Sequence, residues 1–401
     1  MAPVQRIPVQ RITEIDGLRA IAMTMVVAHH CGILPFGWVG VWLFFVISGY
    51  VIARNFRWSG SSDQPASTQY VEFIARRFYR IVPVYVLYVA VGTVIAILIN
   101  QAASLHDLPF LATFTFNWQR IFEFWERPDW SVFGHLWTLS VEEQFYVLFP
   151  VLVLCLSRRR FLGVAVALVI LGPAIRFGYS SLLAAHSSDQ NWLAFAVFSA
   201  SIAHFDAFLI GALLAHFEED LRRSPALLWK MVAASAAIVA AYVLSYAAIN
   251  ANLGATGVGV ARNVFSGVLY GQYREVFVYL AVDACAAVVV AFAALQSKLV
   301  RPLANSFLSL IGRISYGAYL YHALILWLIG AFLTAGPIEE LAPANRVIWF
   351  VVAWLVTVAL AWVSYFYFEL PIMRWAQRGA KTSSERVPLA GQRSATERTC
   401  A

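Results

Sequence analysis

Charged side chains are scarce in this chain of 401 residues: they make up 13% of it, whereas 61% of the residues are hydrophobic. Because a soluble domain carries about 25% charged and about 45–50% apolar residues, this composition excludes a soluble globular enzyme. The four cysteines, at positions 31, 155, 285 and 400, lie far apart and show no paired spacing. That spacing argues against a cysteine metal site or a disulfide framework, and we expect no bound metal.

Ten apolar segments are long enough to cross a bilayer, whose hydrocarbon core of about 30 Å requires about 20 helical residues. The predicted fold class is therefore all-α, a polytopic membrane helix bundle in contact with the lipid bilayer. The predicted spans cover residues 17–34, 38–54, 81–99, 135–156, 161–179, 196–216, 227–249, 275–296, 306–333 and 346–368. The first segment carries Asp16 and Arg19 and has no small-residue cleavage site after it. We therefore predict a retained span rather than a signal peptide.

The basic residues predict the orientation of these spans. With a cytoplasmic N-terminus, 23 of the 29 Lys and Arg residues lie on the cytoplasmic side, as the positive-inside rule requires. An even number of spans then places both termini in the cytoplasm. The orientation of the spans in the membrane thus explains most of the net charge of +7, and we expect no nucleic-acid partner.

Two regions outside the spans have a distinct composition. Residues 100–134 form the longest predicted outer loop, which is rich in aromatic residues and is expected to hold a short interfacial helix. Residues 377–401 are polar and lack periodicity, which predicts a disordered cytoplasmic tail after a membrane domain of residues 1–376.

Arg19 and His30 are the first candidate pair, because ionisable groups inside a span are costly and often functional. Eleven residues of helix rise about 16 Å and turn the chain about 20° beyond three turns, so the two side chains share a face. His29 points about 80° away. From geometry alone, a snorkelling arginine and a structurally satisfied histidine explain the pair equally well.

Two further candidates are an arginine pair and a glutamate pair. Arg77 and Arg80 are three residues apart, a spacing at which two guanidinium groups can clamp one phosphate, although a positive-inside anchor explains them better when they are taken alone. Glu142 and Glu143 lie about a third of the way through a span, and the 100° step between them lets only one face a given cavity. Such a carboxylate can orient a catalytic histidine. The alternative is a buried polar cluster that locks helix packing.

Other polar groups inside the spans are less specific. Ser315, Tyr319 and His322 follow one helical stripe, which predicts the wall of a polar cavity or, alternatively, interhelical hydrogen bonds. His204 and Asp206 are two residues apart and face different sides, so we predict structural roles for them and no mutual contact. Asp283 has no explanation from the sequence.

Six sequence blocks occur in order between residues 12 and 375. They are Glu14–Ala22 with His30, Gly40–Tyr50, Arg76–Pro83, Trp137–Tyr146, Ile314–His322 and Phe368–Pro371. Together they resemble the bacterial acyltransferase-3 family of membrane O-acyltransferases. The resemblance implies ten transmembrane helices in the bacterial cytoplasmic (inner) membrane. It also implies transfer of an acyl group, usually acetyl from acetyl-coenzyme A, to a hydroxyl of a carbohydrate or related acceptor.

The resemblance favours functional roles for Arg19, His30, Arg77 and Arg80. In one departure, Trp42 stands where the family often carries an aspartate. Many members also carry an appended extracytoplasmic hydrolase-like domain, which is not expected after the tenth span here. A partner protein outside the membrane, or a loop of this chain, would then supply its contribution.

The resulting hypothesis is an enzyme that uses cytoplasmic acyl-CoA. The three arginines bind the phosphates of the donor, and the thioester lies near His30, which is oriented by Glu142 or Glu143 and acts as general base on the acceptor hydroxyl. The acceptor is a carbohydrate or a glycosylated molecule, for example a cell-surface polysaccharide. An acyl-His30 intermediate is the alternative mechanism. The alternative function is a secondary transporter with a His/Glu proton relay, which the lack of paired Gly/Pro-broken spans disfavours.

Overall fold

The computed structural model describes residues 11–55, 65–126, 131–261, 264, 271–334 and 336–385. Within these ranges every regular element is a helix, and no strand occurs. The longer helices are α1 (Thr13–His30), α2 (Val39–Asn55), α3 (Ala66–Leu98), α6 (Trp137–Cys155), α7 (Arg158–Ala184), α9 (Phe205–Arg223), α10 (Pro225–Asn252), α12 (Arg274–Ala294), α13 (Ser306–Ile329), α14 (Pro343–Ser364) and α15 (Leu370–Glu385). The predicted all-helical class is confirmed.

Seven helical segments of the described chain are long and apolar enough to cross a membrane. They contain α3, α6, α7, α10, α12, α13 and the continuous stretch of α14 and α15. The other three predicted spans correspond to α1, α2 and α9. Helix α2 has only 17 residues, and α1 and α9 carry several charged residues. The chain is thus a membrane helix bundle, whereas the count of ten spans stays a prediction.

The single helix predicted over residues 196–216 is wrong, because the chain breaks between α8 (Gln190–Ser199) and α9. Ala200 has an extended conformation, and one 3-10 turn follows at Ser201–Ala203. The Asn117 side chain donates to the Ser199 carbonyl oxygen at 3.1 Å and to Ser201 Oγ at 2.9 Å. These bonds supply partners to backbone and hydroxyl groups that a broken helix leaves unpaired.

Two helix ends differ from the predicted boundaries. Helix α3 begins at Ala66, well before the predicted start at residue 81. Helix α15 continues to Glu385, so the first part of the predicted tail is helical, and residues 386–401 lie outside the described residues. In the outer loop the structure has the short helices α4 (Leu108–Ala112) and α5 (Phe116–Phe122), as expected for that region.

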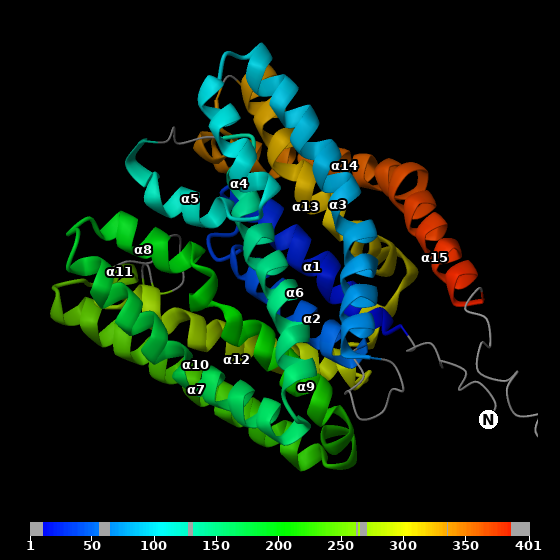
Figure 1. Cartoon of the computed structure of the whole chain (residues 1–401). Helices are drawn as coiled ribbons and strands as arrows, with labels where there is room; N and C mark the ends of the chain where they lie inside the picture. Colours follow the sequence, from blue (N-terminus) through cyan, green and yellow to red (C-terminus); the bar gives the residue numbers. More distant parts are fainter. Residues whose placement is uncertain are drawn as a thin grey trace, which may run out of the picture.

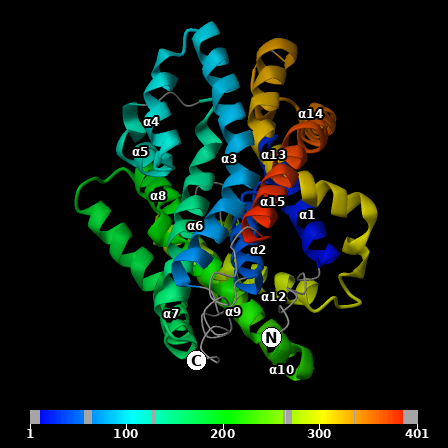
Figure 2. The same cartoon turned by 45° about the vertical axis from the view of Figure 1, so that its right-hand side comes forward.

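Helices α1, α2 and α6 lie in the middle of the molecule, with α3, α13, α14 and α15 on one side and α7 to α12 on the other (Figure 1). The starts of α7 and α10 lie at one end of the bundle, whereas the turn after α3 lies at the opposite end (Figure 2). Helix α2 packs closely on α9, and α1 on α13. This arrangement brings residues of α1, α2, α3, α6 and α13 around one cavity.

Candidate active site

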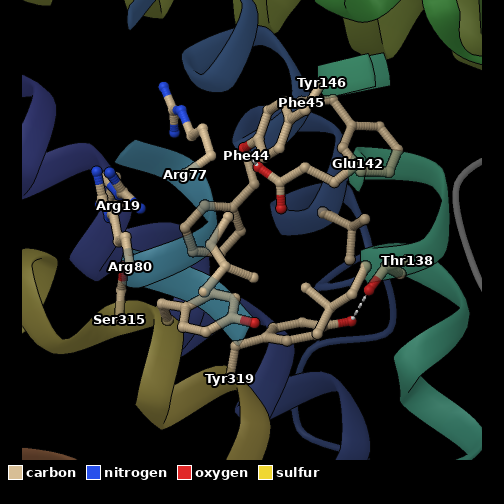
Figure 3. Close-up of a pocket in the computed structure, with 14 residues that line it drawn as sticks. Arg19, Phe44, Phe45, Arg77, Arg80, Thr138, Glu142, Tyr146, Ser315 and Tyr319 are labelled. Carbon is tan, nitrogen blue, oxygen red and sulfur yellow. Dashed lines mark hydrogen bonds between the residues drawn. The ribbon is translucent and has the colours of Figure 1, made fainter. Parts of the chain in front are cut away.

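A partly open cavity, with about 550 Å³ of empty space including its mouth, lies between α1, α2, α3, α6 and α13 (Figure 3). The lining residues are Arg19, Val41, Phe44, Phe45, Arg77, Arg80, Ile81, Thr138, Leu139, Glu142, Tyr146, Ser315, Tyr316 and Tyr319. Six of the nine residues predicted to form the site therefore meet here, from four segments that are distant in the sequence.

Three arginines form the basic side of the cavity. Arg19, Arg77 and Arg80 lie together in Figure 3, and each guanidinium is within electrostatic range of the other two. The Arg77 guanidinium also lies over the Tyr146 ring, 4.8 Å from its centroid. Among the described residues, none of the three forms an ion pair with a carboxylate. Three guanidinium groups at one cavity can bind an anion, and they match phosphate oxygens well.

Glu142 is the one acidic residue among those lining the cavity. Its carboxylate accepts a hydrogen bond from Ser48 Oγ at 2.6 Å and another from the Tyr146 hydroxyl. Within the described chain these two residues, and not His30, are its hydrogen-bond partners. The structure therefore does not contain the predicted Glu142–His30 pair, and Glu142 instead faces the arginines across the cavity (Figure 3).

Tyr319 forms the wall of the cavity opposite the arginines. Its hydroxyl lies 2.7 Å from Thr138 Oγ1 and donates to the His135 carbonyl oxygen at 3.2 Å. Ser315, one helical turn earlier on α13, also lines the cavity, and its hydroxyl donates to the Gly312 carbonyl oxygen. The stripe predicted along this helix thus faces the cavity at these two positions.

His30 and His322 are not among the residues that line this cavity, although His322 contacts Tyr319. The rings of Tyr319 and His322 are 5.2 Å apart, and those of His322 and His30 are 5.4 Å apart. His322 has no exposed surface, whereas His30, at the end of α1, is exposed. The predicted site therefore consists of two parts, an arginine cavity and a histidine cluster, which Tyr319 joins.

Glu143 also lies outside the set of cavity-lining residues. The 100° step from Glu142 explains this difference, as the sequence predicted for one of the two glutamates. Its electrostatic neighbours include Glu142 and Arg77. A catalytic role for Glu143 stays a prediction.

Several residues of the site have no role predicted from the sequence. Tyr146 follows Glu142 by four residues on α6, so helical spacing could have identified it as part of the same face. His135 joins the histidine cluster, with its ring 5.1 Å from that of His322. Phe44 and Phe45 line the apolar part of the cavity, but nothing in the apolar sequence of α2 distinguishes them from lipid-facing residues.

A second polar cluster lies between α7, α9 and α12, away from the cavity. Arg176, which is fully buried, donates to Asp206 Oδ2 at 2.7 Å, and Asp283 is an electrostatic neighbour of both. His204 Nε2 lies 2.8 Å from the Val197 carbonyl oxygen. His204 and Asp206 therefore have separate partners, and Asp283 belongs to the same cluster. Structural roles for His204 and Asp206 stay a prediction.

Trp42, which replaces the aspartate often found in the family, is fully buried beside this second cluster. Its ring stacks on Tyr279 at 4.9 Å and packs edge to face on His204 at 4.9 Å. It does not line the arginine cavity. Among the described residues, no group of three or more His, Cys, Asp or Glu side chains is arranged to hold a metal ion.

The described residues thus form a membrane helix bundle in which a cavity lined by three arginines lies beside a histidine cluster. The chain matches the family described as "Acyltransferase domain" over residues 12–366. It therefore belongs to this acyltransferase-3 family, as the six sequence blocks indicated. No solved structure matches the chain significantly.

Three curated relatives illustrate the similarity. "Putative peptidoglycan O-acetyltransferase YrhL" of Bacillus subtilis (strain 168) is 26% identical over 94% of this chain and 56% of its own length. "Peptidoglycan O-acetyltransferase OatA" of Listeria monocytogenes is 36% identical over 36% of this chain and 24% of its own length. A "Putative O-acetyltransferase" of Staphylococcus aureus (strain COL) is 35% identical over 36% of this chain and 25% of its own length. The chain thus spans between about a quarter and just over half of the relatives that it matches.

Proposed function

We propose that the protein is an O-acetyltransferase of the bacterial cytoplasmic membrane, which transfers an acetyl group from acetyl-CoA to a hydroxyl of a carbohydrate. The observation that supports this proposal is the cavity in which three guanidinium groups face one carboxylate. Coenzyme A carries several phosphate groups, and arginine is the side chain best suited to bind them bidentately. The names of the relatives favour acetyl as the group transferred and peptidoglycan as the first acceptor to test.

The donor binds with its phosphates at Arg19, Arg77 and Arg80. Phe44, Phe45 and Leu139 line the same cavity, and their apolar surfaces suit the pantetheine arm. Arg19 and His30 are separated by about 16 Å of helical rise. The extended arm of the donor can cover that separation, so that the thioester reaches the region of Tyr319 and His30.

His30 acts as the general base. It removes the proton from the acceptor hydroxyl while the hydroxyl oxygen attacks the thioester carbonyl carbon. The C–S bond then breaks, the thiolate of coenzyme A takes the proton from His30, and the acetyl ester and free coenzyme A leave. The exposed position of His30 at the end of α1 suits approach of an acceptor from outside the bundle. Glu142 has a different task in this proposal, which is to order Tyr146 and Ser48 beside the arginines.

The experiment that tests the proposal is an acetyl-transfer assay on the purified protein in proteoliposomes. Acetyl-CoA and a peptidoglycan fragment are supplied, and free coenzyme A and the acetylated glycan are measured. Transfer is expected for the wild type and should be abolished in His30→Ala, provided that this variant folds and inserts normally. Wild-type rates in the folded His30→Ala variant would reject His30 as the base. Acetyl-labelled His30 on a quenched enzyme would favour the acyl-His30 alternative.

The arginine cavity is tested by comparing neighbouring arginines on α3. Loss of one hydrogen bond to a charged group removes about 1.5–3 kcal/mol, so Arg77→Ala should raise the KM for acetyl-CoA about 10- to 100-fold. Arg76→Ala is the matched control, because Arg76 is exposed, pairs with Glu72 at 3.3 Å and does not line the cavity. Its KM should stay within twofold of the wild type (about 0.4 kcal/mol). An unchanged KM in Arg77→Ala would contradict donor binding at this cavity.

Family membership does not favour the transporter alternative. The same proteoliposomes distinguish it, because a transporter would move a labelled glycan across the bilayer without consuming acetyl-CoA. That result, without any release of coenzyme A, would replace the proposed function.

A further inference from the structure

Three imidazole rings lie together beyond the arginine cavity. The ring of His322 is 5.4 Å from that of His30 and 5.1 Å from that of His135. The three residues come from α1, from α13 and from the 3-10 turn Gly134–Leu136. His322 is fully buried and His135 nearly so, whereas His30 is exposed. The ring of the exposed His30 therefore packs beside the ring of the buried His322.

The hydrogen bonds of His322 determine which of its nitrogens carries a proton. Its Nδ1 lies 2.5 Å from the Tyr319 carbonyl oxygen, and a carbonyl can only accept, so Nδ1 donates. In a neutral imidazole the other nitrogen, Nε2, then carries a lone pair. Nε2 is buried and has no hydrogen-bond partner in the described part of the chain. Such an acceptor is costly to leave unpaired, which points to a donor that meets it during function.

His135 cannot be this donor. Its Nε2 lies 3.0 Å from the Leu320 carbonyl oxygen and must donate to it, so its Nδ1 carries a lone pair and is also without a partner among the described residues. Two neighbouring lone pairs cannot bond to each other. His30 is the third ring of the cluster, and no hydrogen bond to another described residue fixes its tautomer.

We propose that His322 is the positioning residue of His30. A ring N–H of His30 donates to Nε2 of His322, which turns the other nitrogen of His30, with its lone pair, toward the acceptor hydroxyl. His322 thereby takes the place that a carboxylate occupies in many base and orienter pairs. The carbonyl oxygen of Tyr319 in turn fixes the ring of His322. Tyr319, which lines the donor cavity, therefore helps to determine the position of the base. This inference rests on the proposed function.

The test compares two amide substitutions of His322 in the acetyl-transfer assay. The amide of Asn reaches the position of Nδ1 and can bond to Tyr319, whereas the longer Gln reaches the position of Nε2 and can accept from His30. We expect His322→Asn to lower kcat about 100-fold, at the lower end of what general-base catalysis contributes. The KM for acetyl-CoA should remain within twofold (about 0.4 kcal/mol). The separate variant His322→Gln should keep kcat within about tenfold of the wild-type value (about 1.4 kcal/mol).

Several results would overturn the proposal. One is a wild-type kcat in the folded His322→Asn variant. Another is an equal loss of kcat in the folded Asn and Gln variants, because an equal loss indicates a packing role. If the variants do not fold, the wild type is used with 15N-labelled histidine. The chain has eight histidines, so few resonances need assignment. A protonated Nε2 at His322 in the resting enzyme would reject the assignment, and an unprotonated Nε2 with a protonated Nδ1 would support it.

The outcomes separate this inference from the proposed function. If the wild-type protein transfers no acetyl group to any glycan tested, the proposed function fails. If the wild type is active and His30→Ala is inactive, but His322→Asn retains full activity, only the role of His322 fails.

Discussion

At the scale of single residues, the ion pair between Arg176 and Asp206 is buried on both sides and lies away from the candidate site. The fully buried Arg176 donates to Asp206 Oδ2 and to the Ala203 carbonyl oxygen, both at 2.7 Å, and its Nε donates to the Val276 carbonyl oxygen at 3.1 Å. The count of basic residues in the sequence predicts only the orientation of the spans. A charge count cannot show that a partner 30 residues away, on α9, holds the side chain inside the bundle.

Breaking this buried pair should destabilise the protein strongly. Arg176→Met leaves Asp206 and Asp283 buried without their cation, and loss of one partner of a buried pair costs about 3–5 kcal/mol. Arg223→Met is the matched control, because Arg223 pairs with Glu219 at 3.0 Å on an exposed part of α9. It should cost less than about 1 kcal/mol. The free energy of unfolding in detergent is the measurement, and equal values for the two variants would contradict the structural role of the cluster.

At the scale of helices, span length and apolar composition predicted most helices correctly, because the bilayer thickness sets both. The sequence could not predict the break after Ser199, since the groups that stabilise it, including Asn117, come from another part of the chain. For the site, helical spacing and the resemblance identified the arginines and Glu142. The same reasoning did not find the His135–His322 contact, because no periodicity relates residues on separate helices.

Helices α2 and α9 pack closely at two glycines, and this contact predicts how substitutions there change stability. A Cβ atom at Gly49 of α2 would collide with the Phe208 carbonyl oxygen of α9, and one at Gly211 of α9 with the Val46 carbonyl oxygen of α2. Small residues permit such backbone contact between membrane helices. Gly49→Ala and Gly211→Ala should therefore each lower stability by about 1–3 kcal/mol, or more where backbone atoms must move.

The control for this prediction is Gly178→Ala on α7, where an added Cβ meets no atom within 4 Å. Alanine has a higher helix propensity than glycine by about 1 kcal/mol, so this variant should be as stable as the wild type or slightly more stable. The midpoint of thermal unfolding in detergent distinguishes the three variants. If Gly49→Ala and Gly211→Ala unfold at the midpoint of Gly178→Ala, then α2 and α9 do not pack as closely as described.

At the scale of the whole molecule, the distribution of charge and the arrangement of the helices together predict the orientation of the bundle in the membrane. Arg158–Arg160 and Arg222–Arg223 lie at the ends of helices that meet at one end of the bundle, where α7 and α10 begin (Figures 1 and 2). Basic residues favour the cytoplasmic side. This end should therefore be cytoplasmic, which is also the side from which acetyl-CoA must enter in the proposed reaction.

Two single-cysteine variants test this orientation after the four native cysteines are replaced. Ser188 is exposed between α7 and α8, and Lys298 is exposed between α12 and α13. A membrane-impermeant maleimide should label Ser188→Cys in intact spheroplasts, and Lys298→Cys only after the membrane is opened. The reverse labelling pattern would show that the bundle has the opposite orientation in the membrane. The exposed His30 would then face the cytoplasm, and since coenzyme A would have to enter from outside the cell, the arginine cavity could not be the entry site for a cytoplasmic donor.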